Sequence, residues 1–511
     1  MGKGLGMTGF SRRFVLGGLL SGAAGVALAE APLTSLRPMP RLVPRAGAPV
    51  AVAAQTAPRT AASAEALVAA AQLGGKVGFV VADARTGLVL EAMNGAEPMP
   101  PASVAKAITA LYALDHLGAD YRFATRLIAT GPVQGGRLAG DLVLAGGGDP
   151  TLSTDTLGDM AAALRAAGIT SVAGRFAVWG GALPFVRAID TTQPDYLGYN
   201  PAVSGLNLNF NRVHFEWKRA QGGYQVSMDA RAERFVPKVY STRIAVANRD
   251  RPVYTYSDKG EVEEWTVAST ALGKGGSRWL PVRRPELYAA DVFQTLARAQ
   301  GLSLPAPQVA KSAPRGTVLV ERASDSLRPL LHDMLRFSNN LTAEAVGMSA
   351  SLRRGGVGRH AQSGPAMSDW LNARAGTGTA RFVDHSGLGG ASRISAMDMV
   401  TALARLGPGH ALRGILKEFT LRDANGKVMQ NHPVQVDAKT GTLNFVSSLA
   451  GWMTAPDGTE LVFAIFTGDV ARRDAIPDAQ KEQPPGASDW VRRSKRLQQQ
   501  LIERWAAVYG A

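Results

Sequence analysis

The sequence predicts an α/β (α+β) protein whose antiparallel sheet is flanked by helices and takes strands from both ends of the chain. Two apolar runs at residues 77–83 and 88–93 surround a turn, which is typical of a hairpin, and their near-continuous apolar residues predict a sheet covered on both faces. Three more strands are expected after residue 433, and apolar residues at helical spacing precede them. Alternating residues in the middle of the chain indicate a β-rich piece within a long insertion.

Composition narrows the class of protein. The chain has 511 residues, 46% of them hydrophobic, and a net charge of +15, which favours anionic surroundings such as nucleic acid, anionic lipid or bacterial cell-wall polymers. The arginines are scattered, so nucleic acid is not an expected partner, whereas peripheral membrane or cell-wall association is compatible with the charge. The absence of cysteine excludes disulfides and cysteine zinc sites, and the seven histidines lack metal-binding spacing. We therefore expect neither a metal nor another cofactor.

The amino terminus has the features of an export signal. Arg12 and Arg13 precede an apolar stretch at residues 14–28, and a small-x-small cleavage pattern ends at Ala29. An uncleaved anchor is the alternative, but about 15 apolar residues are too few to span a bilayer as a helix. We expect a twin-arginine signal peptide at residues 1–29 and a periplasmic protein. The Pro-, Ala- and Arg-rich residues 30–61 are typical of a flexible leader.

A helix is expected directly after the first hairpin, from Ser103 to about Leu117. Pro100 and Pro101 suit a helix start, and apolar residues recur at helical spacing behind them. Ser103 and Lys106 are three residues apart, so they share one helix face. A neutral lysine there can activate the serine hydroxyl as a nucleophile. The alternative is a capping serine beside a solvated surface lysine.

The pattern then changes over about 200 residues. We predict a main domain at residues 62–121 and 321–511, interrupted by an α/β insertion at 122–207 and 284–320. Residues 208–283 alternate apolar and polar positions, which indicates a β-rich subdomain nested in the insertion. The elements expected in the rest of the insertion are a strand at 142–144 and helices at 156–167 and 285–300.

The carboxy-terminal part carries two further short motifs. Ser338-x-Asn340 lies between two expected helices, and Lys439-Thr440-Gly441 lies at the end of an expected strand. Taken singly they have ordinary explanations, because serine and asparagine favour helix junctions and a lysine can simply end a strand. The elements expected here are helices at 327–337, 342–352, 396–406 and 488–509, and strands at 434–439, 447–454 and 461–467.

Together with Ser103-x-x-Lys106, these motifs resemble those of penicillin-binding proteins and serine β-lactamases. Four stretches, residues 144–152, 331–335, 384–388 and 437–443, narrow the resemblance to the D-alanyl-D-alanine carboxypeptidase/endopeptidase family of low-molecular-mass class C penicillin-binding proteins. That family has a long insertion between the first two motifs, which are 338 − 103 = 235 residues apart here. The resemblance implies a penicillin-binding-protein/β-lactamase-like transpeptidase fold.

The reaction can be followed from the residues. Ser103 would attack a peptide carbonyl, and Lys106 would accept its proton, since burial and the nearby charge of Lys439 lower the pKa of Lys106. Ser338 is positioned to relay a proton to the leaving amine, and Asn340 to hold an amide oxygen of the substrate.

Substrate recognition is expected along the third motif. Lys439, Thr440, Gly441 and Thr442 suit a terminal carboxylate. The resemblance implies that the backbone N–H groups of Ser103 and Thr442 form the oxyanion hole, which commonly lowers such a barrier by several kcal/mol.

Two further positions concern side-chain recognition. The resemblance places Asp149 at the rim of the site, where it would hold a substrate ammonium; the alternative is an ordinary Asp-Pro turn. The family often has Ser-Gly-Leu-Ser-Arg where this chain has Gly389 and Gly390 after Leu388. Recognition of a side-chain carboxylate therefore lacks that arginine unless Arg393 replaces it.

The expected function is a serine-type D-Ala-D-Ala carboxypeptidase with possible endopeptidase activity on peptidoglycan peptides, inhibited by β-lactam antibiotics. A serine β-lactamase is a first alternative, although class A enzymes use a dedicated glutamate for deacylation and lack such an insertion. A non-catalytic cell-wall binding protein is a second alternative, but a protein without activity would be expected to have lost at least one of the motif residues.

Overall fold

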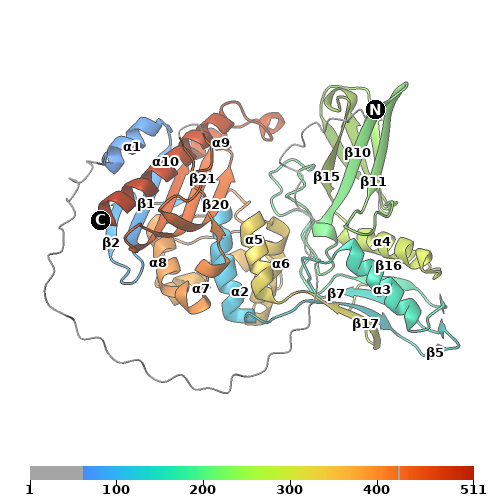
Figure 1. The fold of residues 1–511 in the computed structure, drawn as a ribbon. Coiled ribbons are helices and arrows are strands. Elements are labelled where there is room, and N and C mark those ends of the chain that lie inside the picture. The colour runs from blue at the N-terminus through green and yellow to red at the C-terminus, as the bar shows by residue number, and fades with distance from the viewer. Residues whose placement is uncertain (1–60, 424–425, 511) are drawn as a thin grey trace, which may run out of the picture. The chain divides into compact units, whose positions relative to one another are not determined.

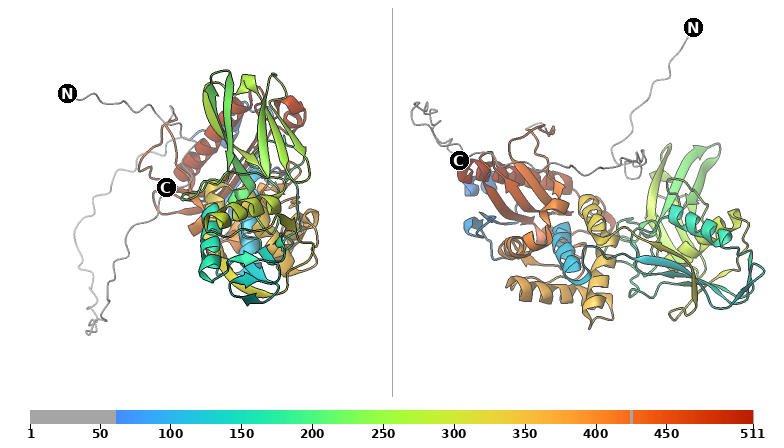
Figure 2. Two further views of the ribbon diagram at one scale, coloured as in Figure 1. Left: turned by 90° about the vertical axis from the view of Figure 1, so that its right-hand side faces the viewer. Right: turned by 60° about the horizontal axis from the view of Figure 1, so that its bottom comes forward.

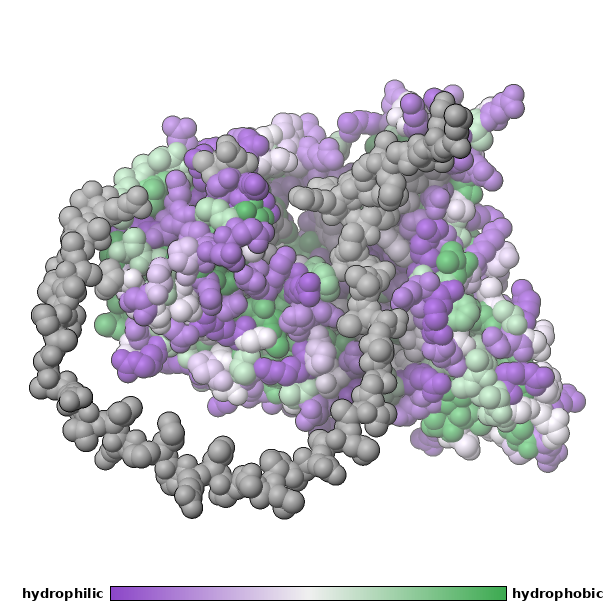
Figure 3. Space-filling view, viewed as in Figure 1, coloured by the Kyte–Doolittle hydropathy of each residue, from purple (hydrophilic) through white to green (hydrophobic). Residues whose placement is uncertain are grey.

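The computed structural model describes residues 61–423 and 426–510. The predicted signal peptide and almost all of the predicted leader lie outside the described residues. Within residues 62–510, no helix in the described part is long and apolar enough to cross a membrane. On the face seen in Figure 3, hydrophilic residues are spread over the described surface with hydrophobic ones between them.

A six-stranded antiparallel sheet forms the centre of the main domain, in the order β19-β20-β21-β22-β1-β2 (Figure 1). The first strand of the chain, β1, pairs with the last, β22, so the two ends of the sequence meet inside one sheet as predicted. The strands are β1 (Lys76–Asp83), β2 (Val89–Met93), β19 (Lys417–Glu418), β20 (Gln435–Leu443), β21 (Val446–Thr454) and β22 (Glu460–Gly468).

Helices cover both faces of this sheet, and Figures 1 and 2 show α10 lying across one of them. Successive residues of β1 point to opposite sides: Phe79 joins the core beneath α1 and α10, whereas Val80 joins the core beneath the other helices. The ring of Trp505 on α10 lies 5.7 Å from that of Phe79. The helices are α1 (Ala64–Ala71) and α10 (Ala487–Tyr509) on one side, and α2 (Ala105–Leu117), α5 (Leu327–Phe337), α6 (Asn340–Arg354), α7 (His360–Ala375) and α8 (Ala396–Leu406) on the other.

The hairpin differs from its prediction in one respect. Strand β1 is buried as expected, but β2 is an edge strand, and Leu88 and Val89 at its start are 66% and 39% exposed. The expectation that both strands are covered on both faces is therefore wrong for β2. An apolar run alone does not distinguish a central strand from an edge strand.

The insertion is built on a five-stranded mixed sheet, in the order β16-β9-β7-β4-β17. Strand β17 pairs with β4 as far as Ala323, and the Phe123 N–H donates a hydrogen bond to the Ser324 Oγ. The sheet of the insertion therefore extends slightly past its predicted boundary at residue 321. The elements are β4 (Ala124–Ala129), β7 (Leu142–Gly146), β9 (Phe176–Trp179), β16 (Pro307–Val309), β17 (Thr317–Ala323), α3 (Thr154–Ala166) and α4 (Pro285–Ala299).

Two three-stranded sheets make up the nested β-rich piece, in the orders β11-β10-β15 and β12-β14-β13. Phe215 and Trp265 from these sheets belong to the same buried cluster as Leu144 and Phe293 of the insertion, so the piece shares its core with the insertion. The strands are β10 (Arg212–Ala220), β11 (Gly223–Asp229), β12 (Thr242–Ala247), β13 (Tyr254–Asp258), β14 (Glu263–Ala268) and β15 (Gly275–Pro281).

Several elements have no counterpart in the prediction. Helix α7 contains Pro365, which ordinarily argues against a helix interior, and α1 lies where the leader was expected to end. The two-residue strands β3 and β18 pair with each other beside the start of α2. The remaining short elements are β3 (Pro98–Met99), β5 (Val133–Gln134), β6 (Arg137–Leu138), β8 (Ser171–Val172), β18 (Ile394–Ser395) and α9 (Val470–Asp474).

Candidate active site

Ser103 lies in a single 3-10 turn, Ala102–Val104, that leads directly into α2. The turn packs against strand β20 at Gly441, where an added Cβ would lie 2.7 Å from the carbonyl oxygen of Pro101 and 2.9 Å from the nitrogen of Ser103. Only a residue without a side chain permits this approach. The close contact fixes the serine beside the third motif.

Lys106 is completely buried one turn further along α2. Its Nζ donates to the Ser103 Oγ at 2.9 Å, to the Asn340 Oδ1 at 2.7 Å and to the Ser386 carbonyl oxygen at 2.7 Å. The first two motifs therefore meet at one amine, as predicted. The alternative in which Lys106 is a solvated surface charge is excluded by its burial.

Burial lowers the pKa of Lys106 to about 7, while the nearby carboxylates of Asp384 and Glu344 act in the opposite direction. A lysine with this pKa is partly neutral near neutral pH and then has a lone pair to accept a proton. The prediction attributed part of the shift to Lys439. Lys439 is not among the groups that shift the pKa of Lys106. The effect runs the other way, because the charge of Lys106 lowers the pKa of Lys439.

The second motif forms the junction of α5 and α6. Ser338 ends α5 in the left-handed region with φ of 57°, and the side chain of Asn339 accepts from the Thr342 N–H to cap α6. Asn340 is the first residue of α6, so this helix begins two residues earlier than predicted. This turn between α5 and α6 directs the Ser338 side chain toward Lys439, whose Nζ donates to the Ser338 Oγ at 3.0 Å.

Asn340 connects the main domain with the insertion. Its Oδ1 accepts from Lys106, and its Nδ2 donates to the backbone carbonyl of Tyr199 at 2.9 Å. One N–H of the amide is left to bind a substrate, as the predicted role of Asn340 requires. Because the contact on Tyr199 is a backbone oxygen, the sequence carries no signal for it.

The third motif lies on β20. Lys439 is buried and also donates to the Thr440 carbonyl at 2.6 Å; burial first, and then Lys106 and Lys417, lower its pKa. Thr442 lines the same cavity as Ser103. Thr440 and Gly441 line a second cavity of about 1100 Å³ instead. The structure therefore brings Thr442, but not Thr440, to the cavity of the nucleophile.

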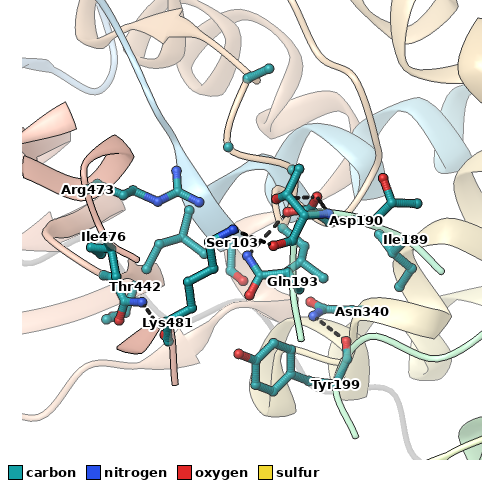
Figure 4. Close-up of a pocket in the computed structure, with 18 of the residues that line it drawn as sticks. Ser103, Ile189, Asp190, Gln193, Tyr199, Asn340, Thr442, Arg473, Ile476 and Lys481 are labelled. Carbon is teal, nitrogen blue, oxygen red and sulfur yellow. Dashed lines mark hydrogen bonds between the residues drawn. The ribbon is translucent and has the colours of Figure 1, made fainter. Parts of the chain in front are cut away.

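That cavity has a volume of about 1190 Å³, and Figure 4 shows the residues gathered around it. Ser103, Ser338, Asn340 and Thr442 line it, which includes both residues assigned to the oxyanion hole. The insertion contributes its own wall, and the segment after β22 contributes another. The lining residues that sequence reasoning missed include Asp190, Gln193, Tyr199, His360, Arg473 and Lys481.

Asp149 is placed differently from its prediction. It is buried, its carboxylate accepts from the backbone N–H and hydroxyl of Thr151, and burial raises its pKa. It is not among the residues lining the cavity, so the structure does not bring it to the rim of the site. Its carboxylate is satisfied by the turn itself, which is the ordinary chemistry of an Asp-Pro turn. Asp190, from the insertion, is an aspartate that does line the cavity.

A buried acid supports the loop behind Lys106. Glu344 accepts from the backbone N–H groups of His385 and Ser386 and from the Nε2 of His360 at 2.9 Å. Against the effect of burial, the hydrogen bond and charge of His360 help lower the pKa of Glu344 to about 2. Burial and the charge of Glu344 raise the pKa of Asp384 to about 7. Ionised Glu344 thus holds the loop whose carbonyl binds Lys106.

Arg473 packs closely against Gly390. An added Cβ at Gly390 would lie 2.5 Å from the Nη1 of Arg473. Arg393, which the prediction offered as a replacement, donates to the carbonyl oxygens of Gly390 and Ser392 at 2.6 and 2.9 Å. Its guanidinium is therefore engaged within its own loop.

Comparison with known proteins decides the family. The model of the D-Ala-D-Ala carboxypeptidase 3 (S13) family matches residues 60–483. The chain belongs to this family. The match covers all three motifs, the insertion and the main domain as far as residue 483, so the expected family is confirmed.

Named relatives agree with the assignment. The chain is 27% identical to a D-alanyl-D-alanine carboxypeptidase of Actinomadura sp. (strain R39) over 484 residues, which are 88% of this chain and 87% of that protein. It is 23% identical to the D-alanyl-D-alanine carboxypeptidase DacB of Haemophilus influenzae over 427 residues, which are 78% and 87% of the two chains.

Among solved structures, penicillin-binding protein 4 of H. influenzae superposes with a TM-score of 0.69 at 20% identity, covering 86% of this chain and 99% of that one. This similarity confirms the expected fold class. Within the described residues, no group of three or more His, Cys, Asp or Glu side chains is arranged to hold a metal ion.

Proposed function

We propose that this chain is a serine-type D-Ala-D-Ala carboxypeptidase that releases the terminal D-alanine from peptidoglycan stem peptides through an acyl-enzyme on Ser103. The observation that carries the proposal is the 2.9 Å contact between the Ser103 Oγ and the Nζ of a buried Lys106 with a pKa of about 7. The family assignment supports the same reaction.

The arrangement around Lys106 favours proton transfer from the serine. The Asn340 Oδ1 and the Ser386 carbonyl oxygen can only accept hydrogen bonds, so they take two N–H bonds of the amine. In neutral Lys106 the remaining direction, toward Ser103, holds the lone pair. The serine hydroxyl can then donate its proton to Lys106 as its oxygen attacks the carbonyl carbon.

The leaving group requires a proton from another direction. Lys439 donates to the Ser338 Oγ, so Ser338 can pass its hydroxyl proton to the departing nitrogen while it takes a proton from Lys439. The C–N bond breaks, the amine of D-alanine leaves protonated, and the acyl group remains as an ester on Ser103. Water then hydrolyses the ester: the water gives a proton back to Lys439 through Ser338, and Lys106 returns a proton to the Ser103 oxygen, which restores the serine.

The same chemistry extends to cross-linked peptides and to β-lactams. In a cross-link the leaving amine belongs to a second stem peptide, and a cavity of about 1190 Å³ has room for more than a terminal D-alanine. We include this endopeptidase activity in the proposal, with periplasmic localisation after twin-arginine export. A β-lactam carbonyl would acylate Ser103 and remain bound, because its leaving nitrogen stays tethered.

A fluorescent penicillin tests the nucleophile. The parent protein is expected to be labelled and Ser103→Ala is not, and the parent alone should release D-alanine from a stem pentapeptide. Equal labelling of both proteins would show that Ser103 is not the nucleophile. Rapid turnover of penicillin would favour the β-lactamase alternative, and labelling without D-alanine release would favour the non-catalytic one.

A further inference from the structure

The second cavity beside strand β20, with a volume of about 1100 Å³, differs from the catalytic cavity in charge. Among the described residues, seven lysine and arginine side chains and three acidic ones line it, whereas three of each kind line the catalytic cavity. Its walls come from α10, from β20 and from the segment that begins with β19. We call it the basic cavity and define it by Lys417 of β19 and by Lys495 and Arg496 of α10.

Four of the seven cations already have partners within the chain. Arg492 and Arg493 pair with Asp489, Arg422 donates to the Gly426 carbonyl oxygen at 2.7 Å, and Arg336 lies over the ring of Phe337. The charge that remains for a ligand is therefore that of the other three side chains, which define the basic cavity.

The side chains of Lys417, Lys495 and Arg496 have no hydrogen-bond or ion-pair partner in residues 61–423 and 426–510. Like charges repel one another in this region: burial and then the charge of Arg422 lower the pKa of Lys495. An anion placed among the cations relieves this repulsion, and a carboxylate forms charge-assisted hydrogen bonds with both lysine and arginine. The basic cavity therefore fits a ligand that carries carboxylates.

The basic cavity adjoins the catalytic cavity along β20. Thr440 lines the basic cavity and Thr442 lines the catalytic one, and two positions on a strand are about 7 Å apart. Ser488 and Val491, near the start of α10, line both cavities. A peptide of a few residues is therefore long enough to occupy both of them.

The position of the basic cavity indicates which part of a substrate reaches it. The third motif on β20 is expected to bind the carboxylate of the leaving residue, so Thr440 on the same strand lies on the leaving-group side. A single leaving D-alanine spans less than about 4 Å and ends at that motif. In a cross-link, the leaving amine belongs to a second stem peptide, which continues beyond the motif and carries further carboxylates.

We propose that the basic cavity binds the leaving stem peptide of a cross-link, with Lys417, Lys495 and Arg496 contacting its free carboxylates. This inference rests on the proposed function. It assigns the endopeptidase substrate class as cross-linked peptides whose leaving stem is anionic, and it disfavours the same peptides with an amidated leaving stem. The release of a single D-alanine makes no use of the basic cavity.

Two synthetic cross-linked peptides test the assignment. In both, the carboxyl group of a D-Ala residue is joined to the side-chain amine of diaminopimelic acid in a second peptide, and the carboxylate beside that amine is free. The other carboxyl groups of the second peptide are free acids in one compound and amides in the other. The parent protein is expected to cleave the acid with about threefold to tenfold higher kcat/KM, and added salt should reduce this preference.

A double variant and a matched control assign the preference to the basic cavity. Lys495→Gln combined with Arg496→Gln should remove the preference by slowing cleavage of the acid only. The rate of D-alanine release from a monomeric stem pentapeptide should stay unchanged. Lys311→Gln combined with Arg315→Gln makes the same change in charge at exposed positions between β16 and β17 that line neither cavity, so this control should keep the preference.

The monomeric pentapeptide separates the two ways in which the inference can fail. If the parent releases no D-alanine from it, the proposed function itself is wrong. If the parent releases D-alanine but cleaves the two cross-linked peptides equally, or cleaves neither, only the role of the basic cavity is refuted. A preference that survives in the double variant, or is lost equally in the control, would also overturn that role.

Discussion

The two buried lysines of the site differ in their hydrogen bonds and in the charges near them. Lys106, on α2, has three hydrogen-bond acceptors and two nearby carboxylates, Asp384 and Glu344, that partly offset the effect of burial on its pKa. Lys439, on β20, has two acceptors and its pKa is influenced only by burial and by other lysines. A proton acceptor needs a pKa near the working pH. We propose Lys106 as the base because its amine lies 2.9 Å from the Ser103 Oγ, and Lys439 as a donor to Ser338.

Removing the two amines in turn is the strongest test of this comparison. Lys106→Met keeps a flexible apolar chain but removes the base, so acylation by penicillin should slow by about 10²- to 10⁴-fold. Lys439→Met leaves the contact between Ser103 and Lys106 intact and should cost about tenfold to hundredfold in kcat/KM. Stopped-flow acylation rates measure both effects, with circular dichroism as the check on folding. A larger loss in Lys439→Met would reverse the two roles.

The pH dependence of acylation follows from the same comparison. The neutral form of Lys106 is the active one, so the rate should rise as the pH passes through about 7. Asn340→Asp places a carboxylate within hydrogen-bond distance of the amine, which favours its protonated form. The midpoint of the rate should move up by about 1 to 3 pH units, and activity lost at neutral pH should return at alkaline pH.

The matching measurement is a pH–rate profile of Asn340→Asp beside that of the parent. Since Asp also removes the donor to the Tyr199 carbonyl, some loss of the maximal rate is expected at every pH. That loss does not move the midpoint. An unchanged midpoint would contradict the assignment of Lys106 as the titrating base.

The packing between β20 and the start of α2 can be tested through Gly441. A methyl group there would lie within 3 Å of the Pro101 oxygen and the Ser103 nitrogen, so Gly441→Ala should separate the nucleophile from the strand. We expect a loss of about 1–3 kcal/mol in unfolding free energy and a slower acylation rate. Gly414→Ala is the control, because no atom lies within 4 Å of its added Cβ. Equal unfolding midpoints for the two variants in urea would show that the contact is not strained.

Much of the site was predictable because its chemistry is local in sequence. Ser103 and Lys106 share one helix turn, and Ser338 and Asn340 share one junction, so helical spacing and turn chemistry locate them. The central sheet was predicted from the apolar runs near both ends of the chain. Helix α8 was predicted with its observed bounds, since no proline or glycine interrupts its pattern.

The rest depends on contacts that leave no local pattern. Tyr199 binds Asn340 through a backbone carbonyl that any residue supplies, and Arg473 reaches Gly390 across a loop from another part of the chain. Asp149 does not line the cavity, and its motif also specifies a turn that satisfies the carboxylate. Glu344 has no motif and is identified only by the burial and hydrogen bonds that the fold creates.

Substitution of Glu344 is expected to give the smallest of these shifts in the acylation profile, and the one that best distinguishes the two lysines. Its charge raises the pKa of Lys106, so Glu344→Gln should lower that pKa and move the midpoint of the acylation profile to lower pH. The charge also raises the pKa of Asp384. Without it, Asp384 ionises more readily and restores part of the negative field at Lys106, so the shift should stay below about one pH unit.

The direction of that shift distinguishes the two lysines, because Glu344 is not among the groups that influence Lys439. A pH–rate profile of Glu344→Gln, recorded with benzylpenicillin, measures it; thermal unfolding checks that the amide still holds the loop at Ser386. A midpoint that does not move, or moves to higher pH, would mean that the base titrated in the profile is not Lys106. A midpoint that moves down while that of Asn340→Asp moves up would tie both changes to one amine, since Glu344→Gln removes and Asn340→Asp adds negative charge near Lys106.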